Sequence, residues 1–126
     1  IGHIHMVQEL RREFPMKPPI LFSVVLGHPG EAPATPEALA AMVNFIPKDT
    51  IWGITHAYRK DFGIIAGALG LGARTVRIGF EDSSYLNPAV QAETNLPLVE
   101  KTVQLLRAMD KEPMTPDEAR KMLNMD

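Results

Sequence analysis

The chain has 126 residues, of which 22% are charged, and a formal net charge of -2, values typical of one globular domain. This charge gives no reason to expect a nucleic-acid partner, and no apolar run approaches the roughly 20 residues that span a bilayer. The sequence therefore favours a cytoplasmic protein that binds neither nucleic acid nor membrane. Because cysteine is absent, any metal must be bound by His, Asp or Glu.

Helices and strands are predicted to alternate in the first half of the chain. Apolar residues at helical spacing predict a helix over residues 3–13. The near-continuous apolar run over residues 20–26 is typical of a parallel strand that is buried on both faces. A second helix is predicted to begin after Thr35 as its N-cap, with Pro36 in the first position, and to end before Pro47.

The same alternation continues through the middle of the chain. Residues 50–55 are rich in β-formers and predict a second strand, with His56 just past its tip. Residues 58–69 then predict a helix, and residues 75–80 predict a third strand. Strands that alternate with helices in this way indicate a parallel α/β sheet.

Two further helices are predicted near the end of the sequence. After a loop through Tyr85 and Pro88, the apolar positions of residues 96–109 predict a long helix that docks on the sheet. Thr115 and Glu118 have the spacing of a capping box, which predicts a short terminal helix.

The predicted fold class is α/β with parallel strands, either a small doubly wound domain or the C-terminal half of a (β/α)8 TIM barrel. Arg77 and Gly79 on one strand face favour the barrel, whose lumen holds large and small residues in layers. A half barrel leaves two sheet edges open to water. The chain also begins at Ile1 without a Met, in what resembles a strand tip. We therefore predict that residues 1–126 are half of a single barrel domain.

The strongest candidate site is the run over residues 76–82. Side chains alternate along a strand, so Arg77 and Glu81 are predicted to share one face. Asp82 follows at once, and the carboxyl ends of parallel strands are where such folds place their chemistry. A buried Arg77–Glu81 ion pair that only fills space is the alternative, but burying such a pair is costly. The opposite, apolar face is predicted to hold Val76, Ile78 and Phe80.

The histidines leave a second hypothesis open. His28, His56 and Glu81 lie near predicted strand tips and could form a self-contained site of two histidines and one carboxylate. The alternative is that these histidines contact substrate or solvent. His3, which is also near a predicted tip, and His5 give a weaker metal signal, because they begin a helix and do not share a face there.

The candidate site also carries a resemblance to a known family. Val76-Arg77 followed by Gly79, Glu81-Asp82 and Tyr85 resembles the V-R-x-G-x-E-D-x-x-Y segment of the β-keto acid cleavage enzymes, which include an enzyme of lysine fermentation. The similarity extends over essentially the whole chain. Further matches are Leu26-Gly27-x-Pro29-Gly30, Pro33-Ala34-Thr35-Pro36, Asn95-x-x-Leu98-Val99-Glu100 and Thr115-Pro116-x-Glu118-Ala119-Arg120.

This resemblance implies a reaction and roles for three residues. Family members depend on Zn2+ and convert a β-keto acid and acetyl-CoA into acetoacetate and a new acyl-CoA. The resemblance makes Glu81 a zinc ligand and makes Arg77 and Asp82 the catalytic pair that helps to deprotonate the keto acid. It also implies the C-terminal half of a barrel and a homo-oligomer.

One departure from the family pattern concerns the other zinc ligands. They are two histidines in an H-x-H motif on an early strand, and this sequence imitates that motif only at His3-Ile4-His5. The flanking residues match the region after the fifth strand instead, so the zinc role is not carried over to His3 or His5. We expect activity from the intact protein rather than from this segment alone.

Two questions remain open from the sequence. A non-catalytic half barrel that binds a partner chain through its open edge is the rival interpretation. The identity of the keto acid is not given, and we expect it to depend on the loops over residues 27–35 and 56–61.

Overall fold

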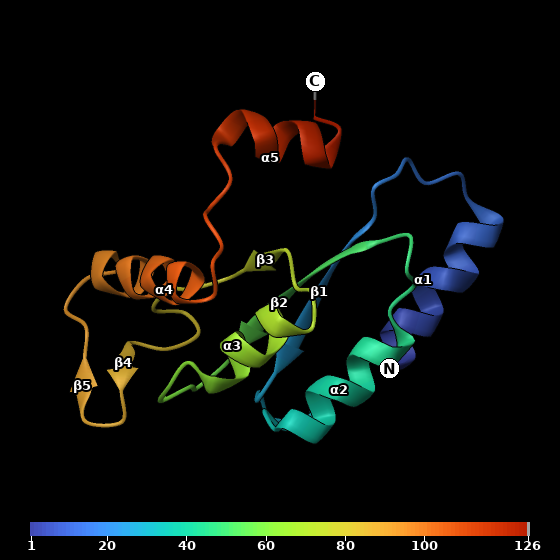
Figure 1. Cartoon of the computed structure of the whole chain (residues 1–126). Helices are drawn as coiled ribbons and strands as arrows, with labels where there is room; N and C mark the ends of the chain where they lie inside the picture. Colours follow the sequence, from blue (N-terminus) through green and yellow to red (C-terminus); the bar gives the residue numbers. More distant parts are fainter. Residues whose placement is uncertain (126) are drawn as a thin grey trace.

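The structure is a computed structural model, and it describes residues 1–125. It confirms the α/β class: the structure contains a three-stranded parallel sheet with helices packed against it (Figure 1). The sheet has the order β1 (Leu21–Leu26), β2 (Ile51–His56) and β3 (Thr75–Val76). The other elements are α1 (Gly2–Glu13), α2 (Pro36–Phe45), α3 (Gly63–Gly70), the hairpin of β4 (Tyr85–Asn87) and β5 (Val90–Gln91), α4 (Leu96–Ala108) and α5 (Pro116–Leu123).

The parallel register brings the carboxyl ends of the strands to one edge of the sheet. β1 and β2 pair along their full length, from Leu21 opposite Ile51 to Leu26 opposite His56. β3 adds only a short parallel pairing beside β2. The loops that follow the three strands therefore lie close together, at the edge where the sequence predicts a site.

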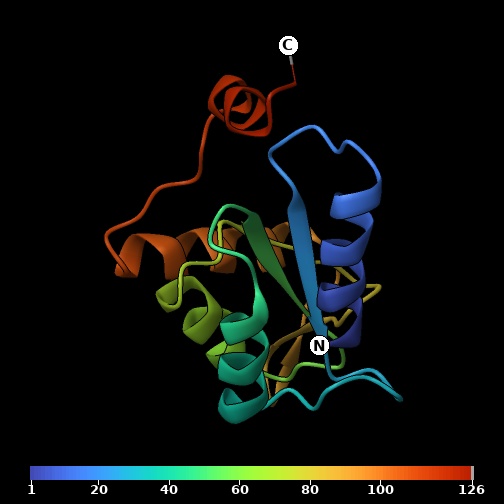
Figure 2. The same cartoon turned by 90° about the vertical axis from the view of Figure 1, so that its right-hand side faces the viewer.

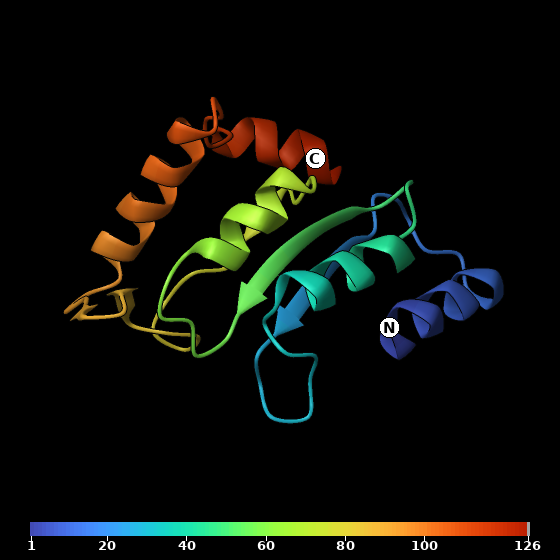
Figure 3. The same cartoon turned by 60° about the horizontal axis from the view of Figure 1, so that its bottom comes forward.

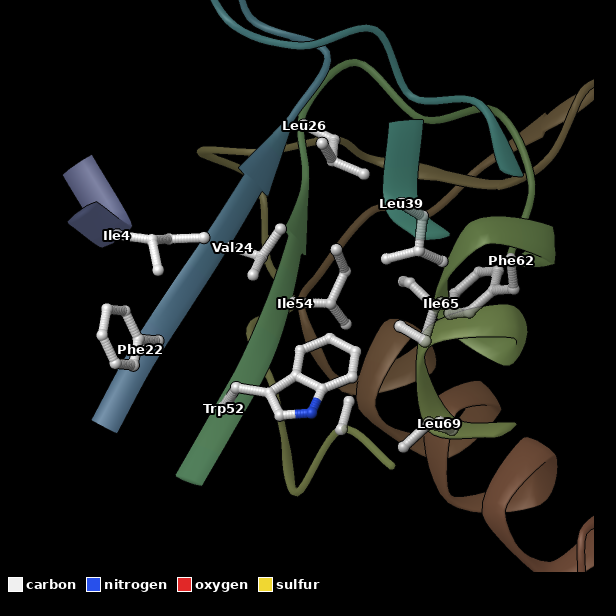
Figure 4. Close-up of a cluster of buried hydrophobic side chains, with 12 residues drawn as sticks. Ile4, Phe22, Val24, Leu26, Leu39, Trp52, Ile54, Phe62, Ile65 and Leu69 are labelled. Carbon is white, nitrogen blue, oxygen red and sulfur yellow. The ribbon is translucent and has the colours of Figure 1, made fainter. Parts of the chain in front are cut away.

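The hydrophobic core lies between one face of the sheet and helices α1, α2 and α3. Val24 and Ile54 point from the strands towards Leu39 of α2 and Ile65 of α3, and all four side chains are at most 2% exposed (Figure 4). The helices form an arc over this face of β1 and β2 (Figure 2). α1 lies at one end of the molecule beside α2, whereas α4 and α5 lie at the other end, beyond α3 (Figure 3).

The other face of the sheet, which we call the polar face, is lined by small and hydroxylic residues. Ser23, Gly53 and Thr75 lie side by side in register. A Cβ atom on Gly53 would lie 1.8 Å from the Thr75 hydroxyl, so only glycine allows this close approach. The hydroxyls of Ser23 and Thr55 are 3.4 Å apart.

The prediction that residues 20–26 are buried on both faces was wrong. Leu26 and Val24 are buried, but Leu21 is 46% exposed and Ser23 is also exposed. The physical reason is that helices cover only one face of the sheet in residues 1–125, so Leu21 and Ser23 on the polar face of β1 meet solvent.

Local sequence signals correctly predicted both ends of α1 and α4 and the first residues of α2 and α5. α1 and α4 begin and end within one residue of their predicted limits. The Thr35 side chain accepts a hydrogen bond from the Ala38 amide at the start of α2. At α5 both bonds of the predicted capping box are present. Ile1, predicted to lie at a strand tip, is instead the N-cap of α1, and His3 lies within that helix.

The helix predicted over residues 58–69 begins only at Gly63. Tyr58 has a left-handed backbone with φ of 54°, which a helix cannot contain. Its amide donates to the Asp82 carbonyl, 2.7 Å away, instead of joining a helical turn. Asp61 then accepts a hydrogen bond from the Gly63 amide at the true start of α3.

The strand predicted over residues 75–80 ends at Val76. The Arg77 amide still donates to the Ile54 carbonyl, but Gly79 has φ of 156° and starts a turn. Phe80, predicted to face the core, is 46% exposed as a result. The predicted loop around Tyr85 also contains more order than expected, because it forms the β4–β5 hairpin.

No helix within residues 1–125 is both long enough and apolar enough to cross a membrane.

Candidate functional site

Arg77 and Asp82 form a two-pronged ion pair at the carboxyl edge of the sheet. The guanidinium Nε lies 3.0 Å from Asp82 Oδ2, and Nη2 lies 2.8 Å from Oδ1. The Asp82 side chain is only 2% exposed, whereas that of Arg77 is 52% exposed. Hydrogen bonds and the negative charge of Asp82 raise the pKa of the Arg77 guanidinium above its ordinary value. The pair therefore presents a buried carboxylate held in a fixed orientation.

Glu81 also forms an ion pair with the Arg77 guanidinium, but its side chain is mostly exposed to solvent. Its Oε2 is 3.2 Å from Arg77 Nη2, and 83% of its side chain is exposed. The alternative of a buried Arg77–Glu81 pair is therefore wrong, because Asp82 is the buried partner. Arg77 follows Val76, which packs on the core, so its side chain leaves from the polar face of the sheet. The exposed Glu81 carboxylate is free on this side to accept a further positive partner.

A tight turn after β3 places the two acids. The amides of Asp82 and Ser83 both donate to the Gly79 carbonyl, at 3.1 and 3.0 Å. The Phe80 amide donates to Asn95 Oδ1, 3.1 Å away, just before α4 begins. These bonds reverse the direction of the chain, so the Asp82 carboxylate lies next to the Arg77 guanidinium.

The loop between β2 and α3 supports this turn from the other side. Tyr58 donates its amide to the Asp82 carbonyl, and Ser83 Oγ donates to the Arg59 carbonyl. The Arg59 guanidinium in turn reaches the carbonyls of Ser83 and Tyr85. Sequence reasoning missed Arg59, because it assigned this residue to the helix predicted over residues 58–69 and singled out no signal in it.

A pocket of about 330 Å³ adjoins the acids. Its lining includes Tyr58, Lys60, Phe80, Glu81 and Asp82. A larger cavity of about 650 Å³ lies at the amino ends of the strands, between the loop before β2 and α5. Within residues 1–125 the lining of that cavity contains neither a carboxylate nor an imidazole, so we place the candidate site at the smaller pocket.

The self-contained metal site of His28, His56 and Glu81 was a wrong prediction. Residues 1–125 contain no cluster of three or more His, Asp or Glu side chains that could hold a metal ion. His28 packs edge-on against Tyr58, with ring centroids 5.3 Å apart. His56 is half-buried, and burial lowers the pKa of its imidazole. The strand tips share an edge, but these three side chains point to different neighbours.

Glu81 nevertheless has the character of one metal ligand. Zn2+ accepts carboxylate oxygen among its ligands, and this carboxylate is exposed beside a pocket. A complete site needs three or four protein ligands, and residues 1–125 place no second imidazole or carboxylate ligand around Glu81 beyond the Asp82 already held by Arg77. His5 lies elsewhere, in α1, 3.9 Å from Glu9.

Comparison with known families gives a match over nearly the whole chain. The family profile described as beta-keto acid cleavage enzyme matches residues 1–125. The chain belongs to this family. Five of the six residues that we quoted from the V-R-x-G-x-E-D-x-x-Y segment lie between Arg77 and Tyr85, so the match includes the candidate site.

Curated relatives extend the comparison to individual proteins. The chain is 34% identical over 122 residues to a 3-keto-5-aminohexanoate cleavage enzyme of Acetoanaerobium sticklandii, covering 97% of this chain and 44% of that protein. It is 36% identical over 107 residues to the protein of the same name in Fusobacterium nucleatum, covering 85% and 38%. A 3-dehydrocarnitine:acetyl-CoA trimethylamine transferase of Rhizobium meliloti is 31% identical, covering 98% and 41%. The chain thus spans less than half the length of these relatives.

Proposed function

We propose that the intact protein transfers a two-carbon unit from a β-keto acid to acetyl-CoA, giving acetoacetate and a new acyl-CoA. Family membership and the names of the relatives support a keto-acid cleavage or transfer reaction with acetyl-CoA as co-substrate. The single structural observation that carries the proposal is the buried Asp82 carboxylate, clamped by Arg77 beside the exposed Glu81.

In this proposal Asp82 accepts the proton. The carbon between the keto and carboxylate groups must lose a proton before it can attack the thioester carbonyl of acetyl-CoA. Asp82 is a general base of fixed orientation for that step, and Arg77 holds both carboxylate oxygens in place. This attack expels the CoA thiolate, which then adds to the original keto carbonyl. Cleavage of the carbon–carbon bond releases the new acyl-CoA, and the acetoacetate carbanion takes back the proton from Asp82.

Glu81 is the proposed ligand of Zn2+ in this chain, with the remaining ligands supplied from outside residues 1–125. When bound, zinc supplies Lewis-acid polarisation of a carbonyl oxygen. The exposed Glu81 carboxylate lines the pocket beside Asp82, which supports this role.

Three further features are part of the proposal. We propose that the chain forms the C-terminal half of a (β/α)8 barrel, which agrees with a parallel sheet whose helices cover one face. We also propose a homo-oligomer and a cytoplasmic location. The rival interpretation, a non-catalytic module, receives no support from the relatives, whose names describe enzymes.

The proposal is tested by incubating the intact, zinc-loaded protein with acetyl-CoA and a panel of β-keto acids. We expect acetoacetate and a new acyl-CoA to form in equal amounts with at least one acid, as measured by mass spectrometry. An Asp82→Asn variant, which keeps the size of the side chain, should form neither product. A folded, zinc-loaded protein that converts no member of the panel would contradict the proposal.

A further inference from the structure

We infer that Arg59 is the positioning residue of this site, a role that rests on the proposed function. Arg59 does not line the pocket beside Glu81 and Asp82, so it is placed to act through the residues that do. It lies on the loop between β2 and α3, in the segment where the sequence predicts a helix. Its task is to fix the backbone that follows Asp82.

The segment over residues 82–86 is held by donors from other elements rather than by the sheet. Tyr58 donates its amide to the Asp82 carbonyl at 2.7 Å. Arg59 donates to the carbonyls of Ser83 and Tyr85, and Lys101 of α4 donates to the carbonyl of Leu86. The Ser84 carbonyl accepts from the Ala92 amide at 2.8 Å. All five carbonyls in this segment are therefore hydrogen-bonded, and Arg59 holds two of them.

Burial distinguishes Arg59 from an ordinary surface arginine. It is only 1% exposed and is the largest of the fully buried side chains. Among residues 1–125 no carboxylate lies within ion-pair distance of it, and its Nε is buried without a hydrogen-bond partner. The guanidinium lies 4.2 Å from the centre of the Phe62 ring, which partly compensates for the lost water.

Such burial is expensive for a side chain that only packs. An unpaired buried charge is costly, and an apolar side chain would fill the same space without that cost. What only a planar, forked donor provides is simultaneous contact with two carbonyls. Ser83 completes the arrangement, because its hydroxyl donates back to the Arg59 carbonyl. Arg59 and Ser83 therefore each donate a hydrogen bond to a carbonyl of the other residue, and these bonds hold the β2–α3 loop against the segment that follows Asp82.

The test compares Arg59→Met, which keeps the length but removes charge and donors, with Arg59→Lys, which keeps the charge and one donor. In the intact protein we expect Arg59→Met to lower kcat about 10- to 100-fold, because small misplacements of catalytic groups have effects of that size. KM for the keto acid and acetyl-CoA should stay unchanged. Arg59→Lys should recover part of the lost kcat.

A second readout does not depend on turnover. Amide hydrogen exchange over residues 82–87 should become faster in Arg59→Met, with α2 unchanged. Arg74→Met is the matched control, since Arg74 lies before β3 at the other end of the sheet and its Nη2 lies 4.0 Å from the Met122 sulfur. It should change neither kcat nor this exchange. If Arg59→Met does not fold, Arg59→Lys and Ser83→Ala are compared with the wild type instead, and we expect smaller changes in kcat and in amide exchange.

Unaltered exchange over residues 82–87 would overturn the inference, and so would a folded Arg59→Met protein with the kcat of the wild type. Loss of activity only in proportion to the unfolded fraction would also overturn it. A wild-type protein without turnover would refute the proposed reaction instead, and the exchange experiment would still decide the role of Arg59.

Discussion

The β1–β2 half of the sheet and the region after β3 are built on different principles. β1 and β2 are paired residue by residue over six positions, and their buried face belongs to a core to which α1, α2, α3 and α4 all contribute. β3 has two residues, and the chain after it is held by side-chain donors and by single backbone contacts from distant segments. The paired strands β1 and β2 contribute most of the stability. The irregular chain after β3 brings Glu81 and Asp82 to the same guanidinium, which the alternating side chains of a strand could not do.

The largest difference in stability should appear when one apolar side chain is truncated in each region. Ile54→Ala should lower the free energy of unfolding by about 3 kcal/mol, because Ile54 is 1% exposed within the core. Phe80→Ala should cost less than about 1 kcal/mol, because Phe80 is 46% exposed. Urea unfolding of both variants measures the difference. Equal losses would show that the turn is packed as tightly as the core.

Arg77→Ala should have an intermediate effect on stability and a strong one on turnover. It leaves the buried Asp82 carboxylate without its partner, which should cost about 1 to 3 kcal/mol. Arg120→Ala is the matched control, because its partner Asp117 is 96% exposed, and such surface pairs contribute about 0 to 1 kcal/mol. Thermal unfolding and steady-state rates measure both. We expect Arg77→Ala to reduce turnover more than zinc content.

Tyr58 offers a smaller effect of backbone geometry. At φ of 54° any residue with a Cβ is strained, whereas glycine is not. Tyr58→Gly should therefore be more stable than Tyr58→Ala by about 1 kcal/mol, the reverse of the order in a helix. Equal stability, or a more stable alanine variant, would show that this loop relaxes when the Tyr58 ring is removed.

The smallest expected effect is a pH dependence from His56. Burial lowers the pKa of this imidazole, so the unfolded chain binds a proton that the folded protein disfavours. Stability should therefore fall as the pH drops below about 6.5, the ordinary pKa of histidine. His56→Gln should show a weaker fall than the wild type, and His3→Gln, on the exposed surface of α1, should behave as the wild type. Melting temperatures between pH 5 and pH 8 measure this, and identical profiles would refute it.

The sequence predicted those elements whose signals lie within one helical turn. Thr35 and the Thr115–Glu118 box bond to amides three residues away, so their helices begin where expected. The alternation after Val76 predicts a longer strand, but the bond to Asn95 that favours a turn comes from 15 residues further along. Hydrogen bonds between residues so far apart in the sequence cannot be predicted from the local pattern of apolar and polar residues.

The site was predictable only in part for a similar reason. The run over residues 76–82 places Arg77 near two acids, and the structure brings all three together. Which acid is buried depends on the turn at Gly79 and could not be predicted from alternation. Arg59 escaped notice because its partners are backbone carbonyls, which every residue has, and its burial depends on a segment 24 residues away.

The central claim is that Glu81 holds a catalytic metal beside the Arg77–Asp82 pair. It is tested most directly by measuring the zinc content and turnover of Glu81→Gln in the intact protein, with Glu100→Gln on α4 as the control. The account predicts that zinc content falls and turnover is lost by about 100-fold or more in Glu81→Gln, with neither changed in the control. A Glu81→Gln protein that keeps its zinc and its full turnover would contradict the account.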